Sequence, residues 1–340
     1  MPNPYPPHQE PLPVIRAAKK AGELFAGAVI AIGNFDGVHR GHRAVIDAAR
    51  TRARAAGGPA VALTFEPHPR AFFQPGEPMF RLTDEQAKLR LLATAGLDGV
   101  VCLPFNAALA RLSAEEFVEG VLVEEMRIAG VAVGFDFHFG RARGGSPAFL
   151  AEQGKRLGFA VDVVSPLAAD GRPVSSSAIR AALGDGRVAE AAELLGHPWF
   201  VTGSVIHGEK RGRELGYPTA NLRLDPACGL RHGIYAVRVG IGATRHDGVA
   251  SFGRRPTFDD GAPLLEIFLF DFAGDLYGTT LDVAFVCWIR PELKFDGVEA
   301  LIARMDEDSR QARGLLAAAP DAFPPIAPIS KPVIPDRPKA

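Results

Sequence analysis

The sequence predicts an α/β domain with a parallel sheet, followed by a small antiparallel β-barrel that ends in a helix. Between residues 28 and 164, short apolar runs alternate with segments of helical periodicity, which is the pattern of βαβ units. Beyond about residue 186, glycine and proline become frequent, and strand-like runs are separated by turns with little helix between them. The 340 residues are enough for two domains.

The elements of the first half follow from local patterns. Apolar runs predict strands that are buried on both faces, at Ala28–Gly33, Pro59–Phe65, Gly99–Leu103, Ala129–Gly134 and Phe159–Val164. Stretches rich in Ala, Arg, Glu and Leu predict helices, at His42–Ala56, Thr83–Ala95, Ser113–Ile128 and Pro147–Leu157. Ser113 and Glu116 have the spacing of a capping box, which marks the start of the third helix.

The second half has the pattern of a barrel. Its candidate strands are Phe200–His207, Gly233–Val239, Asp247–Phe252, Pro263–Phe272 and Thr280–Ile289. Residues Asp296–Leu316 predict one closing helix, and the tail from Pro320 carries seven prolines in 21 residues, so we expect it to be extended or loosely attached. The domains expected are therefore 14–186, 187–318 and a Pro-rich tail at 319–340.

Composition excludes several classes of protein. A hydrophobic fraction of 47% and a charged fraction of 23% are normal for a globular protein, and a net charge of −1 argues against a nucleic-acid-binding protein. The three cysteines are far apart, which argues against a disulfide scaffold or a structural zinc site. No signal peptide and no run of 18 apolar residues is visible, so we expect a soluble cytoplasmic protein that does not enter membranes.

One string of ten residues, from Gly33 to His42, lies between a predicted strand and a predicted helix. Its glycines allow a tight turn and close approach of a ligand. The start of the following helix offers free N–H groups to a phosphate, and His39 and His42 are spaced to lie on one side of that turn. A surface turn with incidental histidines and half of a metal site are the alternatives.

A second string, from Gly203 to Leu222, combines a glycine-rich basic loop with the sequence Pro218-Thr219-Ala220-Asn221. The loop could cover a phosphate, or it could be a solvated charged loop. In an extended chain Thr219 and Asn221 project to the same side, where their oxygens would suit Mg²⁺ beside phosphates. Read alone, these four residues could also form a simple turn.

Glu266 is a carboxylate within the apolar run Leu264–Phe270. Strand alternation puts Glu266 on the same face as Leu264 and Phe268. A carboxylate on such a face must be solvated at an edge or have a partner in a pocket. The run alone does not decide between these two alternatives.

The first string resembles the nucleotidyltransferase superfamily that carries His-x-Gly-His in a Rossmann-like domain. The closest resemblance is to the FMN adenylyltransferase module of bacterial bifunctional riboflavin kinase/FAD synthetases. Three further segments agree in order, namely Thr64–Arg70, Val133–Gly140 and Val174–Arg180, with Ser177 in place of the usual Thr. The second string resembles the signature of riboflavin kinases.

For the first domain, the resemblance implies transfer of AMP from ATP to the phosphate of FMN, with release of pyrophosphate. His39 and His42 would be the catalytic residues. The implied ATP-binding residues are Gly33, Phe35, Asp36, His39, Gly41, His42, Ser176, Ser177 and Arg180. The implied FMN-binding residues are His68, Pro69 and Asp136. For Phe65, Phe137 and Phe139, as for Cys102, we expect core packing.

For the second domain, the resemblance implies phosphorylation of riboflavin by ATP, with Glu266 as the base for the riboflavin hydroxyl. The implied ATP-binding residues are Gly208, Lys210, Gly212, Thr219 and Asn221, and Thr219 and Asn221 would also hold Mg²⁺. Ser251 and Phe268 depart from the family pattern, where Asn and His are common.

The expected ligands are riboflavin, FMN, FAD and ATP, and the expected state is a monomer or a weak homo-oligomer. The alternative is a nucleotidyltransferase for another phosphorylated substrate, such as phosphopantetheine, with a barrel that binds flavin without catalysis.

Overall fold

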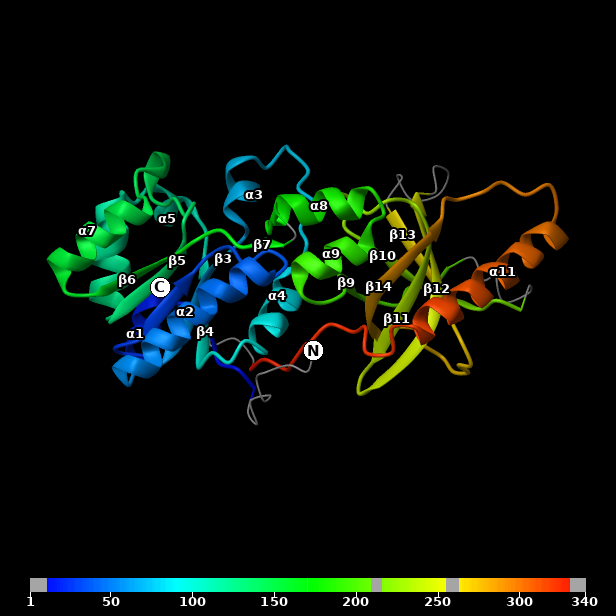
Figure 1. Cartoon of the computed structure of the whole chain (residues 1–340), viewed down its shortest axis with the longest axis horizontal. Helices are drawn as coiled ribbons and strands as arrows, with labels where there is room; N and C mark the ends of the chain where they lie inside the picture. The colour runs from blue at the N-terminus through cyan, green and yellow to red at the C-terminus, as the bar shows by residue number, and fades with distance from the viewer. Residues whose placement is uncertain (1–10, 170, 209–215, 255–262, 331–340) are drawn as a thin grey trace, which may run out of the picture. The chain divides into compact units, whose positions relative to one another are not determined.

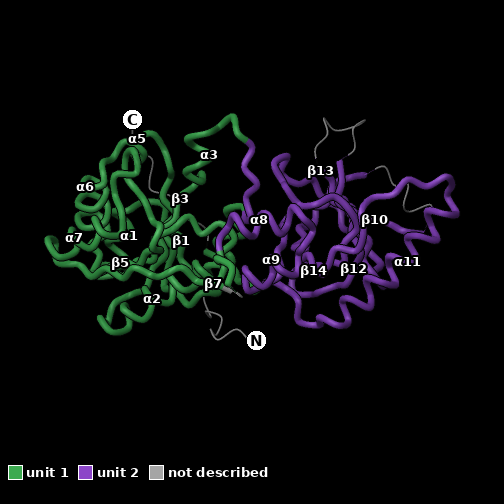
Figure 2. Tube along the Cα trace, turned by 45° about the horizontal axis from the view of Figure 1, so that its top comes forward, with its two compact units in different colours: residues 1–77, 84–174, 325–340 green, residues 78–83, 175–324 purple. Residues whose placement is uncertain are grey.

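The computed structural model describes residues 11–169, 171–208, 216–254 and 263–330 (Figure 1). The chain forms two compact units (Figure 2). The first comprises residues 1–77, 84–174 and 325–340, and the second comprises residues 78–83 and 175–324. The division falls before residue 175, whereas the sequence-based boundary falls after residue 186. That boundary stays a prediction about which fragment folds independently.

The first unit is built on a six-stranded parallel sheet. Across the sheet, the strands are β1 (Val14–Ile15), β4 (Gly99–Pro104), β3 (Ala60–Glu66), β2 (Val29–Ile32), β5 (Gly130–Gly134) and β6 (Ala160–Val164). The five predicted strands are confirmed. Strand β1 was not predicted, because its two residues are too few to form a recognisable pattern.

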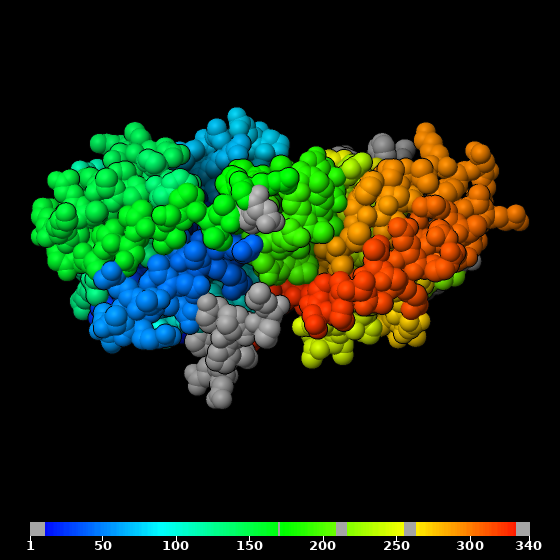
Figure 3. Space-filling model, viewed as in Figure 1, coloured from blue at the N-terminus to red at the C-terminus, as the bar shows by residue number. Residues whose placement is uncertain are grey.

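Helices cover the sheet on both faces, because the central strands are apolar and buried on both of their faces. Ile30 and Ile32 belong to a core that also includes residues from α1 (Ala18–Leu24), η1 (Phe117–Glu125) and α7 (Pro147–Leu157). On the sheet's remaining face, α2 (Arg40–Ala56) packs against β2, β3 and β5. The outer side of α2 is exposed in Figure 3, where it is drawn in blue.

Short elements complete the first unit. They are α3 (Pro69–Phe73), α4 (Glu85–Leu92), α5 (Ala107–Arg111), α6 (Ala114–Glu116), η2 (Arg141–Arg143), β7 (Ala168–Ala169) and β8 (Arg172–Pro173). The capping box of Ser113 and Glu116 is present and starts α6. The helix predicted over Ser113–Ile128 is present as α6 followed by η1, which is a π-helix. An apolar pattern alone does not separate these two kinds of helix.

The strand order brings the candidate loops to one edge of the sheet. The chain runs outward from β2 through β3 to β4, then crosses to β5 on the opposite side of β2. In parallel sheets, ligands bind at the carboxyl ends of the strands where the order reverses in this way. The loops after β2, β3 and β5 meet at that edge, and they carry His39, His68 and Asp136.

The second unit contains an antiparallel six-stranded sheet. Its strands in order are β10 (Thr219–Arg223), β13 (Pro263–Leu269), β12 (Thr244–Arg254), β11 (Gly233–Ile241), β14 (Thr280–Arg290) and β9 (Phe200–Ser204). A bridge between Ile206 and Asn221 joins the two ends, so the sheet is a nearly closed barrel. The predicted barrel is confirmed, and β10 was missed as a strand.

Within the described residues, the helices of the second unit are α8 (Ser176–Gly184), α9 (Val188–Leu195) and α11 (Val298–Ala317). The predicted closing helix is confirmed as α11, which packs on β11, β12 and β14 and is exposed along its outer side (Figure 3, orange). Arg238 on β11 donates to the carbonyls of Leu316, Ala319 and Pro320, and so satisfies acceptors that the end of α11 leaves open.

The described part of the Pro-rich tail is anchored. Ile329 forms a parallel bridge with Leu12, and the amide of Ser330 donates to the Leu12 carbonyl at 3.0 Å. The Ser330 hydroxyl accepts from the amide of Val14 at 3.2 Å. Of the two expected alternatives, an extended or a loosely attached tail, loose attachment is wrong for residues 325–330, because the unpaired edge of the first strand offers them hydrogen-bond partners.

Candidate active sites

His39 is the N-cap of α2. Its Nδ1 accepts a hydrogen bond from the amide of His42 at 3.2 Å. An N-cap side chain satisfies one of the open N–H groups of a helix start. Because Nδ1 accepts here, a neutral His39 ring carries its proton on Nε2, which is then a donor.

The two histidine rings are stacked, with centroids 3.6 Å apart and planes at 16°. The edge of Phe35 contacts His42, with centroids 5.3 Å apart. The buried Nδ1 of His42 has no hydrogen-bond partner within the described residues. Burial, together with the charges of His39 and Lys88, holds the pKa of His42 well below its usual value. His42 is therefore neutral at pH 7 and offers a polar atom to a ligand.

The backbone of this loop leaves no room for larger residues. A Cβ on Gly41 would lie 3.1 Å from the ring of His39. Phe35 and Val38 have positive φ angles of 51° and 43°, a region that side chains disfavour. Both side chains are fully buried, and Asp36 is 4% exposed. The packed side chains hold the strained turn in place.

The neighbouring loops carry the residues expected at FMN. His68 is the N-cap of α3, where its Nδ1 accepts from the amide of Arg70 at 3.1 Å, and Pro69 is the first residue of α3. Asp136 is exposed in the turn after β5. Phe65 is in the core and Phe137 and Phe139 pack against it, as predicted. Burial raises the pKa of Cys102 to about 11, as fits a core thiol.

Ser176, Ser177 and Arg180 lie on the first turns of α8, in the second unit. Ser175 caps this helix by accepting from the amide of Ala178 at 3.2 Å. Arg180 donates through Nε to the carbonyl of Phe80 at 2.6 Å. The segment 78–83 therefore orients the guanidinium, and no sequence pattern predicts this contact.

In the barrel, Asn221 is buried and its side-chain amide donates to the carbonyl of Thr219 at 3.3 Å. This bond fixes the amide, so its nitrogen is the donor and its Oδ1 is left as an acceptor or metal ligand. A Cβ on Gly208 would lie 2.5 Å from Asn221 Nδ2, so the loop can pass this close only at a glycine. Lys210 and Gly212 lie outside the described residues.

Glu266 lies in a row of three residues across adjacent strands. On one side it pairs in register with Asn221 of β10, and on the other with Ser251 of β12. Directly opposed residues of antiparallel strands have side chains on the same face. The burial of β13 alternates, with Leu265 and Ile267 buried and Glu266 partly exposed. Phe268, on the face of Glu266, contacts the ring of Tyr217, with centroids 4.6 Å apart and planes tilted by 53°.

Residues 23–178 match the family model for FAD synthetase, and residues 195–316 match the model for riboflavin kinase. The bifunctional riboflavin kinase/FMN adenylyltransferase of Pseudomonas fluorescens is 44% identical over 87% of this chain and 94% of its own length. The protein of the same name from Escherichia coli K12 is 40% identical over 84% of this chain and 92% of its own. The chain belongs to the bifunctional riboflavin kinase/FMN adenylyltransferase family.

A solved structure shares the whole architecture of the family. The Streptococcus pneumoniae protein whose structure is titled a macrolide-efflux protein superposes with a TM-score of 0.79 and is 33% identical. The match covers 88% of this chain and 98% of that one. Among the described residues of this family member, no helix combines the length and apolar character needed to cross a bilayer.

Two residues of the adenylyltransferase half were missed as candidates. Glu66, at the end of β3, forms an ion pair with Lys88 of α4 at 2.6 Å, and both side chains are buried. A sequence signal existed for Lys88, because it is spaced three and four residues from the buried Leu91 and Leu92. A lysine on the apolar face of a helix needs a buried partner.

Proposed function

We propose that the two reactions of the family are carried out here by two separate sets of residues, one in each half of the chain. The chain is a bifunctional enzyme that uses ATP to phosphorylate riboflavin to FMN and to adenylylate FMN to FAD. The residue assignments are ours. The observation that supports them best is the stacked pair His39 and His42, with an unpartnered buried Nδ1, at the start of α2.

In the adenylyltransferase, an oxygen of the FMN phosphate attacks the α-phosphorus of ATP. The bond from that phosphorus to the bridging oxygen breaks, and pyrophosphate leaves with the electron pair. No protein nucleophile is needed, so the enzyme has to align two phosphates and offset their charge. His39 and His42 donate hydrogen bonds to the ATP phosphates, helped by the positive end of the α2 dipole.

We assign the remaining family positions as the resemblance implies them. Gly33, Phe35, Asp36 and Gly41 shape the nucleotide loop, Ser176, Ser177 and Arg180 bind the β- and γ-phosphates, and His68, Pro69 and Asp136 bind FMN. The loops after β2, β3 and β5 leave the sheet at the edge where parallel sheets bind ligands, which supports a common site for the residues they carry.

In the riboflavin kinase, Glu266 accepts the proton of the riboflavin hydroxyl as that oxygen attacks the γ-phosphorus of ATP. The bond from the γ-phosphorus to the β–γ bridging oxygen breaks, and ADP leaves. Support comes from the partial exposure of Glu266 and its register with Asn221, which put a carboxylate beside a phosphate-binding motif. Gly208, Lys210 and Gly212 belong to the loop that would cover the phosphates.

The donor set of Thr219 and Asn221 fits Mg²⁺. The ion takes hydroxyl and carbonyl oxygens, and the bond from Asn221 Nδ2 to the Thr219 carbonyl leaves Asn221 Oδ1 for it. When bound, Mg²⁺ would offset the charge of the ATP phosphates. In the described part of the chain, His, Cys, Asp and Glu side chains nowhere gather in a group of three that could hold another kind of metal site.

Incubation of the full chain with riboflavin, ATP and Mg²⁺, followed by chromatographic separation of the flavins, tests this function. FMN should form first and FAD later. Unchanged riboflavin, with FAD formed only from added FMN, would favour a barrel that binds flavin without catalysis. Failure of both steps would favour a nucleotidyltransferase for another phosphorylated substrate. We further propose a cytoplasmic protein that is a monomer or weak homo-oligomer and binds no nucleic acid, in keeping with its net charge of −1.

A further inference from the structure

Lys88 is a buried cation at the carboxyl edge of the parallel sheet, and the mechanism above does not use it. Only 1% of the residue is exposed. Its Nζ lies 2.6 Å from Glu66 Oε1, 3.2 Å from Thr64 Oγ1 and 3.3 Å from the carbonyl of Phe65. A fourth acceptor, the carbonyl of Asn34, lies at 3.5 Å. The ammonium thus joins α4, the end of β3 and the loop after β2.

Packing alone does not account for this arrangement. A buried ion pair loses hydration on both charges, and its replacement by apolar side chains of similar size is often neutral or stabilising. A methionine at position 88 and a glutamine at position 66 could fill the same space. A methionine at position 88 would donate no hydrogen bond, whereas the ammonium of Lys88 donates to backbone and hydroxyl oxygens from two loops at once.

The contacts of Lys88 fall on the backbone that leads into the nucleotide loop. The Asn34 carbonyl belongs to the peptide bond that precedes Phe35, whose φ is 51°. That carbonyl also accepts from the Thr64 hydroxyl at 3.2 Å, and Thr64 accepts from Lys88. A fixed orientation of this peptide holds Phe35 in its strained conformation, and Phe35 contacts His42.

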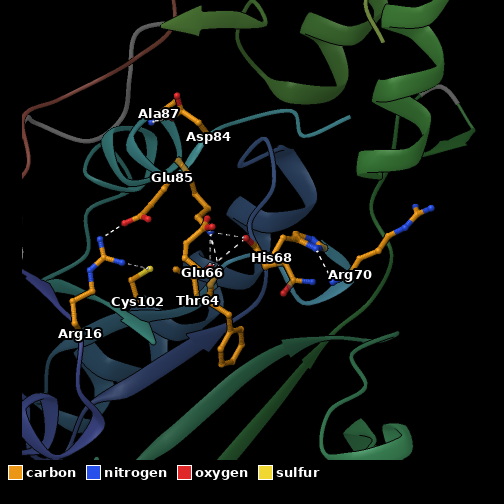
Figure 4. A network of polar contacts seen from close by, with 12 residues as sticks. Arg16, Thr64, Glu66, His68, Arg70, Asp84, Glu85, Ala87 and Cys102 are labelled. Carbon is orange, nitrogen blue, oxygen red and sulfur yellow. Dashed lines mark hydrogen bonds and ion pairs between the residues drawn. The ribbon is translucent and has the colours of Figure 1, made fainter. Parts of the chain in front are cut away.

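The helix that carries Lys88 is itself held firmly. Asp84 caps α4 by accepting from the amide of Ala87 at 2.7 Å. Glu85 forms an ion pair with Arg16, which also donates to Cys102 Sγ at 3.2 Å. Figure 4 shows Arg16, Glu85 and Cys102 together on one side of the network, and Thr64 and Glu66 next to them. Because α4 is held in this way, a side chain that it carries can fix the position of a neighbouring loop.

We propose that Lys88 is a positioning residue for adenylyl transfer. It fixes the position of the loop that carries Phe35 and His39 relative to the loop that carries His68. This inference rests on the proposed function, since it assumes that these loops bind ATP and FMN. Lys88 reaches the reaction only through the backbone and touches no substrate. Displacement of an aligned group by about 1 Å can lower a rate 100-fold, so the effect should appear in kcat.

The full chain with Lys88→Met and Glu66→Gln together is the main test, because the double substitution leaves no unpaired buried charge. We expect a thermal midpoint near that of the wild type. The kcat of FAD formation should fall roughly 10–100-fold, with a change of about threefold or less in the KM for ATP. Riboflavin phosphorylation in the same preparation should stay within about twofold, because it uses the other half of the chain.

A second variant tests the proposal even if the double variant is unstable. Thr64→Val keeps the ion pair but removes the hydroxyl that donates to Asn34, and it should lower the kcat of FAD formation roughly 3–10-fold. The matched control is Lys20→Met, which removes an exposed lysine paired with Glu23 and should leave both activities unchanged.

A wild-type kcat for FAD formation in both the double variant and Thr64→Val would overturn the inference, and Lys88 would then be only the counterion of Glu66. His42→Ala, assayed in parallel, separates this failure from a failure of the proposed site. If His42→Ala is impaired and the other two variants are not, only the role of Lys88 is wrong. If His42→Ala is also unimpaired, the proposed site itself is wrong.

Discussion

Asn221 and Glu266 face each other in register across β10 and β13. This pairing brings a carboxylate next to the amide that is buried beside Thr219 and Gly208. In the roles proposed above, a proton acceptor and two oxygen ligands lie on the neighbouring strands β13 and β10. In a kinase, this arrangement allows the base and the metal-bound phosphates to be positioned by the same part of the barrel.

Glu266→Gln should lower the rate of riboflavin phosphorylation by roughly 10²–10⁴, since glutamine keeps the size of the side chain but accepts no proton at neutral pH. FAD formation from added FMN should continue at the wild-type rate. Steady-state assays of both reactions check this, with Glu299→Gln, an exposed residue in the first turn of α11, as the control. A kinase rate near that of the wild type would make Glu266 a solvated edge residue.

Asn221→Ala should raise the Mg²⁺ concentration needed for half-maximal riboflavin phosphorylation. The rise should be roughly tenfold or more, because even the loss of a residue that only supports a metal ligand commonly lowers affinity 10–100-fold. A Mg²⁺ titration of both activities measures the effect, and the FAD-forming reaction should keep its wild-type dependence. Equal shifts in both reactions would mean that the substitution disturbs the whole protein and does not act on a metal site in the barrel.

His42→Ala should depress FAD formation by about 10²–10³, or roughly 2–4 kcal/mol of transition-state stabilisation, through the loss of one donor to the phosphates. Riboflavin phosphorylation should change little. The two reactions are measured separately, with His246→Ala in β12 as the control, since neither site includes it. A parallel loss of both activities would indicate misfolding, and a wild-type rate of FAD formation would exclude a role at the phosphates.

The depressed pKa of His42 predicts a dependence of stability on pH. Burial, His39 and Lys88 lower this pKa in the folded state, while the unfolded chain should titrate near about 6.5. Below about pH 6.5 the unfolded chain binds a proton at His42 that the folded protein does not bind. The stability that comes from keeping His42 neutral is therefore present at neutral pH and is lost as the pH falls toward the folded-state pKa.

Thermal unfolding of the wild type and of His42→Asn between about pH 7.5 and 5.5 checks this prediction. The wild type should lose more stability over the range than the variant does. Parallel curves would mean that the ring of His42 is able to take up a proton in the folded state.

The position of α8 predicts which fragment of the second half is stable. Ile179 and Leu183 are fully buried, and α8 packs on α9. A fragment of residues 175–324 should be soluble and retain riboflavin kinase activity. A fragment of 187–324 should have a lower thermal midpoint, since burial of each such side chain contributes about 1.5–3 kcal/mol. Equal midpoints would support the sequence-based boundary at 187.

The sequence by itself determined the elements whose signals are local. Apolar runs predicted β2–β6, and the helix start after Gly33 predicted the setting of His39 and His42. A turn, a cap and a helix dipole depend on residues within a few positions of each other, so their chemistry can be read from spacing. Pro218–Asn221 and Glu266 were likewise found from local patterns and from resemblance to the family.

Only the tertiary structure decided which distant segments share a site. The register of Asn221 with Glu266 depends on strand pairing, and the ion pair of Lys88 with Glu66 depends on the packing of α4 against the end of β3. The same holds for Phe80 with Arg180, and for Ile329 with Leu12. Such contacts are selected by the free energy of the whole packed arrangement, in which a buried polar group must find its partner, and no single stretch of sequence carries that information.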